Sequence, residues 1–176
     1  RIKNNRQEQL DAALFASAEK QLTRYALVRG GIRYAYNSAF ESPILYSLQT
    51  KFNLPNSQIL KVAYGKGFRA PSLKELYLDF NDSRHELFGD STLKSETSHS
   101  FTVSYLKYYS KGKAKMSTTV DGFYNNIENK IELIVTGPIQ AKYGNIGKYQ
   151  SVGGDISQKI LYEDFGLNAS LNYTGV

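Results

Sequence analysis

Residues 64–77, YGKGFRAPSLKELY, combine the pattern of a β-strand with the start of a helix. The first six residues alternate between two faces, and the aromatic residues share one of them. Ser72 is followed three residues later by Glu75, which is the spacing of a helix-capping box. Pro71, between the two patterns, has no backbone N–H to donate to a sheet. The sequence therefore predicts a strand that ends before Pro71 and a short helix that begins after Ser72.

The same period of two recurs along the chain on both sides of this stretch, in eight segments altogether. Their apolar positions are Leu10, Ala12, Leu14, Ala16 and Ala18; Ala26, Val28, Ile32, Tyr34 and Tyr36; Ile44, Tyr46, Leu48 and Phe52; Leu60, Val62, Tyr64 and Phe68; Phe101, Val103 and Tyr105; Met116, Val120 and Tyr124; Val152, Ile156, Ile160 and Tyr162; and Leu167, Ala169, Leu171 and Tyr173. The intervening positions are rich in Arg, Lys, Asp, Ser and Asn. Strands of about ten residues, apolar outside and polar inside, are typical of transmembrane β-barrels. The sequence predicts an all-β, antiparallel transmembrane β-barrel segment of about eight long strands, and a soluble antiparallel β-domain is the alternative.

The connections between these segments alternate between short and long. Residues 19–24, 53–58, 108–114 and 162–166 make short connections, and residues 37–42, 70–94 and 126–149 make the others. Membrane barrels place short turns on the periplasmic side and long loops outside the cell. The chain after Ala70 is therefore expected to begin a long extracellular loop, which carries the short helix.

Composition excludes several classes of function. The 176 residues contain no Cys, so there is no disulfide framework and no thiolate metal site. The formal charge of +6 comes from Lys and Arg residues scattered along the chain, which argues against nucleic acid as a partner. No apolar run is long enough for a membrane helix. Catalytic and phosphate-binding motifs are absent from the sequence, so we expect no enzyme and no cofactor.

The stretch GKGFRAPSLKELY resembles a motif of TonB-dependent outer-membrane receptors. The matching residues are Gly67, Phe68, Arg69, Ala70, Pro71, Ser72 and Glu75. A second motif of that family, Asn-Pro-x-Leu-Lys-x-Glu-Thr, matches in part. Leu93, Lys94, Glu96 and Thr97 fit it, whereas Asp90 and Ser91 replace Asn-Pro. Residues 121–133 and 143–155 are similar to downstream strands of the family and the loop between them.

The resemblance implies a barrel of 22 strands with a plugged lumen. Residues 1–176 are then expected to be a partial barrel from a longer chain, with neither the plug nor a signal peptide in this sequence. The resemblance also implies active transport of a scarce ligand, haem or an iron-siderophore, across the outer membrane of a Gram-negative bacterium. The expected partners are that ligand, outer-membrane lipid, and the TonB energy-transducing complex through the plug segment. A small eight-stranded barrel with a structural or adhesive role, and a receptor for cobalamin or glycans, are the alternatives.

Within the family, haem receptors carry a histidine between the two motifs that ligates iron, and His85 lies at this place. The resemblance makes His85 the candidate haem-iron ligand, with Tyr77 and Phe80 stacking on the porphyrin. Arg69 and Arg84 are further candidate ligand-binding residues. The alternative is that His85 is a solvated loop histidine. No metal site other than His85 with haem is expected.

Four more basic residues are expected in the lumen with Arg69, and they are Arg29, Arg33, Lys61 and Lys159. They either attract an anionic ligand or form ion pairs with Asp155 and with carboxylates of the plug. Arg69 is equally expected to anchor the plug. His99 has the parity of Phe101 and is expected in the barrel wall near the membrane interface.

Acidic residues gather in the loop after the helix and are a candidate calcium site. They are Asp79, Asp82, Glu86 and Asp90. Their spacing follows no calcium-loop template, which favours a hydrated acidic loop instead.

Overall fold

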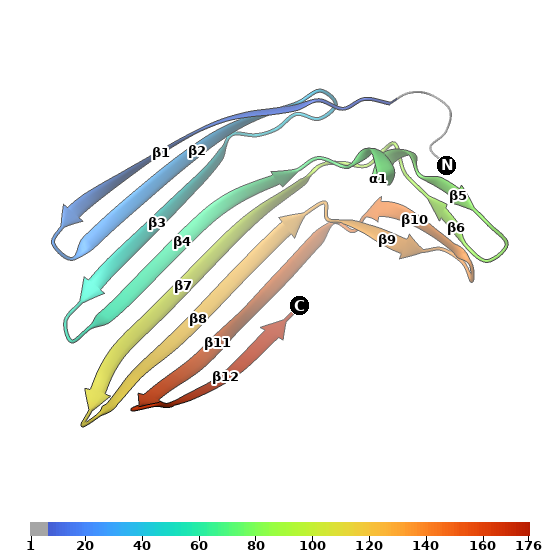
Figure 1. Cartoon of the computed structure of the whole chain (residues 1–176). Helices are drawn as coiled ribbons and strands as arrows, with labels where there is room; N and C mark the ends of the chain where they lie inside the picture. Colours follow the sequence, from blue (N-terminus) through green and yellow to red (C-terminus); the bar gives the residue numbers. More distant parts are fainter. Residues whose placement is uncertain (1–6) are drawn as a thin grey trace.

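The computed structural model describes residues 7–176, which form twelve strands and one short helix. Eight long strands make the wall: β1 (Asp11–Thr23), β2 (Ala26–Asn37), β3 (Leu45–Leu54), β4 (Gln58–Arg69), β7 (Glu96–Lys111), β8 (Ala114–Glu128), β11 (Lys148–Tyr162) and β12 (Phe165–Gly175). They form one curved antiparallel sheet in the order β1-β2-β3-β4-β7-β8-β11-β12 (Figure 1). All eight strands that the alternation predicts are confirmed.

The pairing register joins the apolar positions of neighbouring strands into one continuous face. Leu48 lies opposite Tyr64, Tyr64 opposite Phe101, and Phe101 opposite Tyr124. This face is open, with Leu14 78% exposed. Because a sheet of a soluble domain packs such a face against a core, the exposed face fits contact with lipid instead.

Short turns join the long strands at the end of the wall away from α1 (Leu73–Tyr77). Three of these turns contain a residue with left-handed backbone geometry: φ is positive at Asn56, Gly112 and Glu163. The predicted short connections are confirmed, but β1 and β7 continue into stretches expected as turns. Ladder pairing to the neighbouring strand carries on there, for example between Lys111 and Ala114.

The two outer strands of the wall each have one partner. Within the described residues, β1 pairs only with β2 and β12 only with β11. The eight strands therefore form an open sheet and not the closed eight-stranded barrel of the alternative. Each outer strand leaves one edge of backbone N–H and C=O groups without a partner strand.

Two long loops build a second sheet that the sequence did not predict. It contains β5 (Asp79–Asn81), β6 (Glu86–Phe88), β9 (Ile131–Val135) and β10 (Gln140–Asn145), in the order β5-β6-β10-β9. The central pair, β6 and β10, is parallel and comes from different loops. These strands have three to six residues, too few for a periodic pattern to identify.

The buried core lies at the base of these loops rather than in the wall. Leu76, Leu93 and Ile131 form it, with Tyr77 and Tyr143 packed against them. Three separate segments of chain therefore meet below the loop sheet. Among the described residues, no helix is long and apolar enough to cross a membrane.

Candidate functional site

The junction between β4 and α1 has the capping geometry that the sequence predicts. The Glu75 backbone N–H donates to Ser72 Oγ over 3.3 Å, and the Ser72 backbone N–H donates to Glu75 Oε2 over 2.7 Å. Both halves of the capping box are present. Pro71 is fully buried, which fixes the bend between the strand and the helix.

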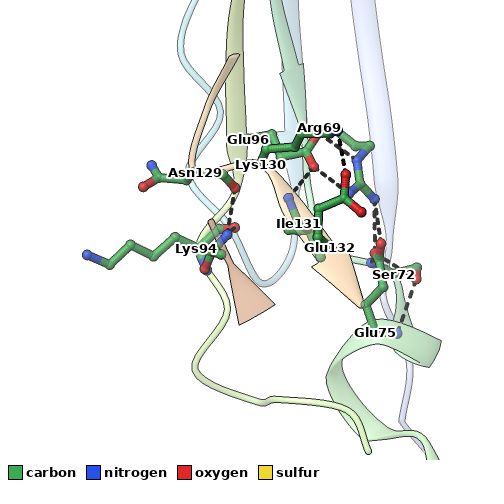
Figure 2. Close-up of polar contacts among 10 residues, drawn as sticks. Arg69, Ser72, Glu75, Lys94, Glu96, Asn129, Lys130, Ile131 and Glu132 are labelled. Carbon is green, nitrogen blue, oxygen red and sulfur yellow. Dashed lines mark hydrogen bonds and ion pairs between the residues drawn. The ribbon is translucent and has the colours of Figure 1, made fainter. Parts of the chain in front are cut away.

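Arg69, the last residue of β4, joins this helix to the next strand of the wall. Its Nε and Nη2 donate to the two carboxylate oxygens of Glu96 over 2.9 and 2.7 Å, and Nη1 donates to both oxygens of Glu75 over 3.0 and 2.9 Å (Figure 2). The arginine side chain is 44% exposed and each glutamate 14%. The guanidinium fork therefore bridges two nearly buried carboxylates from α1 and β7.

Glu96 extends this cluster to the second long loop. Its Oε1 also accepts the backbone N–H of Ile131 over 2.7 Å (Figure 2). Arg69, Glu75 and Glu96 thus connect β4, α1, β7 and the first residue of β9. We call these three side chains the junction cluster.

The arginine determines the charge state of the junction cluster. Burial by itself raises the pKa of Glu75, but the Arg69 hydrogen bonds and those from Ser72 outweigh it and lower the pKa below its ordinary value. Both carboxylates are then ionised around one cation at neutral pH. The sequence predicted Glu75 as a capping residue and Glu96 as part of a motif. Only the structure shows that Arg69 binds both of them.

Asn145 ties the base of the two long loops together. Its side-chain amide donates to the carbonyl oxygens of Lys94 and Asn129 over 3.0 and 2.6 Å, and its Oδ1 accepts the Lys94 N–H over 2.8 Å. Farther out, Gln140 Nε2 donates to Glu86 Oε2 over 3.2 Å. The loops are therefore linked by side chains as well as by the β6–β10 pairing.

An ion pair adds a third link between the loops. Lys142 Nζ lies 2.9 Å from Asp90 Oδ2. The Lys142 hydrogen bond, followed by those from Thr92, lowers the pKa of Asp90 to about 2.

Gly89, the residue before Asp90, lies against α1, where an added Cβ would lie 2.7 Å from backbone atoms of Leu76 and Leu78. Only glycine fits this contact without a shift of the helix.

His85 lies at the tip of the β5–β6 hairpin, with its side chain 66% exposed. Asp82 Oδ1 accepts the backbone N–H groups of Arg84 and His85, each over 2.7 Å, and so fixes the turn. These two backbone hydrogen bonds lower the pKa of Asp82. The imidazole Nδ1 lies 3.7 Å from the same carboxylate oxygen. The turn therefore presents an imidazole whose Nδ1 side faces an anion.

The structure places the other candidate ligand residues of the loop in two regions. Tyr77 packs against the loop core, whereas Phe80 is 41% exposed on β5 and Arg84 is exposed in the turn beside His85. Phe80 and Arg84 share the hairpin with His85 and stay candidates for ligand contact. Arg69 faces two carboxylates of this chain, and its predicted contact with a ligand or a plug remains a prediction.

Three of the four acidic residues of the calcium hypothesis have separate structural roles, and the fourth, Asp79, begins β5. Asp82 closes the hairpin turn, Asp90 pairs with Lys142, and Glu86 accepts from Gln140. In the part of the chain that the structure describes, no three His, Asp or Glu side chains gather where they could hold a metal ion.

The basic residues predicted for the lumen lie on the polar face of the wall, opposite the apolar face. The register places Arg29 opposite Gln49 and Lys61 opposite Ser104. Arg29 pairs with Glu19 over 2.6 Å and not with Asp155. Arg33, Lys61 and Lys159 form no ion pair among residues 7–176. These cations remain available to an anion from outside the chain.

A curved wall with one lipid-type apolar face, a polar face and long loops at one end is typical of a segment of an outer-membrane β-barrel. Comparison with known proteins identifies the family. The model of the "TonB dependent receptor-like, beta-barrel" family matches residues 2–175, so the chain belongs to this family. The motif around Arg69 is thereby confirmed as a family resemblance, and so is the location in the outer membrane of a Gram-negative bacterium. The family consists of receptors and transporters.

Two curated relatives come from Haemophilus influenzae. Hemoglobin and hemoglobin-haptoglobin-binding protein C is 28% identical over 104 residues, which are 59% of this chain and 9% of that protein. Probable hemoglobin and hemoglobin-haptoglobin-binding protein 3 is 30% identical over 106 residues, again 59% and 9%. The matched part of the chain therefore spans about a tenth of the length of these relatives.

Solved structures show the same fold. The hemophore receptor HasR of Serratia marcescens, in complex with its hemophore HasA and heme, matches with a TM-score of 0.79 and 14% identity, over 96% of this chain and 34% of that one. The siderophore receptor PirA of Pseudomonas aeruginosa matches with a TM-score of 0.74 and 22% identity, over 94% and 32%. The all-β antiparallel fold predicted from alternation is thus confirmed as the barrel wall of this family.

Proposed function

We propose that this chain is part of the wall and extracellular loops of a TonB-dependent uptake receptor, and that the receptor takes up haem. The observation that carries the proposal is the position of His85 at the tip of the β5–β6 hairpin. This hairpin pairs with β10 of the second long loop. The names of the curated relatives support a haem-related ligand. An iron-siderophore is the second candidate ligand, because the chain shares its fold with siderophore receptors.

The geometry around His85 suits an axial ligand of haem iron. Imidazole is a common iron ligand, and a carboxylate beside its other ring nitrogen orients the ring and raises its basicity. Asp82 lies on the Nδ1 side of His85, so Nε2 is the nitrogen that points to a ligand. Phe80 and Arg84, on the same hairpin, supply an apolar surface and a cation for the macrocycle and its propionates.

The receptor in this proposal moves its ligand without changing it chemically. Unpaired cations on the polar face, such as Lys61 and Lys159, make the lumen attractive to an anionic cargo. The eight strands are a section of a larger closed barrel, because β1 and β12 each need a further partner strand. A plug within that barrel and the TonB energy-transducing complex complete the transporter.

A haem titration of the intact receptor in detergent tests the proposal. The Soret absorbance is followed for the wild type, for His85→Ala and for Ser83→Ala, an exposed substitution in the same turn that leaves the imidazole in place. We expect a Soret shift in the wild type and in Ser83→Ala, and its loss in His85→Ala.

The other outcomes separate the parts of the proposal. A Soret shift that His85→Ala leaves unchanged would keep haem as the ligand and reject His85 as the iron ligand. Absence of haem binding by the wild type would reject haem, and a ferric siderophore is then tested by quenching of tyrosine fluorescence.

A further inference from the structure

The loop sheet, at the outer end of the wall (Figure 1), has two faces of different character. Residues that are directly paired across strands share a face, and two neighbouring rows of the register contain only apolar or aromatic side chains. These rows are Phe80, Leu87, Ala141 and Val135, and Tyr143 with Leu133. We call the face that carries both rows the core face.

The base of the core face is covered, whereas its outer end is open. Tyr143 packs against the buried loop core. Along β9, the residues on this face become steadily more exposed, from Ile131 at 7% to Leu133 at 43% and Val135 at 78%. Phe80, at the other end of its row, is exposed as well. An apolar surface that continues outward from a core and remains uncovered marks a binding site.

The polar links between the two loops lie on the opposite face of the sheet. Gln140 and Glu86 are directly paired and joined by a hydrogen bond, and Lys142, two residues farther along β10, pairs with Asp90. Ile134 is opposite Lys142 and lies on this second face too. Polar contacts therefore join the loops on one side of the sheet and leave the apolar side open to a partner.

His85 lies on the core face. The Asp82 backbone N–H donates to the His85 carbonyl oxygen over 2.9 Å, so the pairing of the β5–β6 hairpin continues to these two residues. Because side chains alternate along a strand, His85 is on the same face as Leu87, two residues away. The Glu86 N–H donates to the carbonyl oxygen of Ile139 over 2.7 Å, which brings Ile139, itself exposed, beside His85. An imidazole and apolar side chains from both loops thus lie next to one another.

This combination fits a flat, apolar metal chelate. Imidazole ligates iron, and apolar side chains around it can contact the ring that holds the iron. Leu87 is about 7 Å from His85 along the strand, and the strand that follows Ile139 is about 5 Å away, so both residues are within reach of a porphyrin centred on the imidazole. A siderophore whose oxygen atoms fill every position on iron leaves none for His85 and gains little from an apolar surface.

We propose that the outer end of the core face binds the macrocycle of haem, with Leu87 and Ile139 in contact with the ring and His85 on its iron. This inference rests on the proposed function and adds the second long loop to the site. The apolar contacts do not involve the metal, so the same surface also binds an iron-free porphyrin. In this arrangement one ring contacts both loops.

Two probes and the intact receptor in detergent test this surface. Haem is followed by its Soret absorbance, and protoporphyrin IX, which has no iron, by its fluorescence, each against micelles without protein. The wild type is compared with Leu87→Asn, Ile139→Asn, Ile139→Val and His85→Ala. Ile134→Asn is the matched control, because Ile134 is an exposed isoleucine of the same loop on the opposite face. Heat-modifiable mobility in gel electrophoresis verifies that each variant is folded.

We expect the wild type, Ile134→Asn and Ile139→Val to bind both probes with equal affinity. Leu87→Asn and Ile139→Asn should each weaken the binding of both probes by about tenfold, which corresponds to about 1.4 kcal/mol, because each loses the apolar contact of one side chain. His85→Ala should lose the Soret shift of haem and keep the wild-type affinity for protoporphyrin IX.

The opposite results separate this inference from the proposed function. A wild type that binds haem but not protoporphyrin IX would overturn the apolar surface and leave the proposed function intact. Equal affinity of Leu87→Asn, Ile139→Asn and Ile134→Asn for protoporphyrin IX would also overturn it, and a protein partner would then be the occupant to test. Binding of neither probe by the wild type would overturn this inference together with haem as the ligand.

Discussion

Arg69 has a structural role that its position at the end of a barrel strand did not reveal. Its guanidinium lies between Glu75 of α1 and Glu96 of β7, and Glu96 in turn accepts the Ile131 N–H. Removing the arginine leaves two nearly buried carboxylates facing each other without a cation. Arg69, the last residue before the long loop, therefore also stabilises the base of that loop.

At the residue scale we predict that Arg69→Met destabilises the base of the loops. Breaking a buried ion pair costs about 3–5 kcal/mol, and the partial exposure of Arg69 reduces the expected loss to about 2 kcal/mol. Hydrogen exchange of the α1 amides in the intact receptor measures the change in local opening free energy. Arg29→Met is the control, because it breaks an ion pair between two exposed side chains and is expected to change little. Equal protection of α1 in both variants would contradict the role of the junction cluster.

At the scale of elements, the two long loops form one structural unit rather than two independent flaps. The parallel pairing of β6 with β10, the Asn145 amide and the Asp90–Lys142 ion pair all join residues more than 50 positions apart in the chain. The His85 hairpin and residues 140–145 are therefore held together by backbone pairing and by side-chain contacts.

We predict that acid loosens the contact between these two loops. The Asp90 carboxyl has a pKa of about 2 in the folded chain and an ordinary value of 3.8. A lowered pKa means that the stabilisation is complete above about pH 4 and is lost as the pH falls toward 2. Because Lys142 is half-exposed, the loss is on the order of 1 kcal/mol.

Hydrogen exchange of the β6 and β10 amides between pH 6 and pH 2.5, corrected for intrinsic rates, measures this effect. Asp90→Asn is the matched variant, because it removes the titrating group and keeps the shape of the side chain. Its protection should be low and independent of pH over this range. A wild type whose β6 and β10 protection does not change with pH would rule out the ion pair as a link.

At the scale of the whole molecule, the wall is an open, curved sheet, and its exposed apolar face and strand edges are unfavourable in water. Among residues 7–176, the outer strands β1 and β12 each have one edge without a partner strand, and large side chains on them are exposed, such as Phe15 at 81% and Phe165 at 80%. Such edges and faces associate with other chains or with lipid.

We therefore predict that residues 1–176 produced alone sediment as aggregates without detergent. The intact receptor of our proposal has further strands that cover both edges, and in detergent it should remain monodisperse under the same centrifugation. The outer edge strands of the isolated chain should also bind a dye specific for cross-β structure. A monomeric, soluble isolated chain would contradict the assignment of the open face to lipid.

The sequence by itself determined the wall, because the evidence for it is local. Strand alternation repeats every two residues, so Tyr64 and Phe101 could be placed on the apolar face without knowing that they are partners. The capping box is local too, since Ser72 and Glu75 are three residues apart. The short connections could also be predicted, because Pro, Asn and Gly residues that favour turns are local features of the sequence.

Only the tertiary structure decided how the loops assemble and which side chains meet there. Gly89 has no local pattern that reveals its close approach to α1, and Arg69 finds Glu96 across a distance of 27 residues. Strands as short as β5 and β6 contain too few residues to show a period, and their pairing with β10 depends on contacts between separate loops. Local patterns define the faces of strands, whereas contacts between distant segments depend on how the whole chain folds.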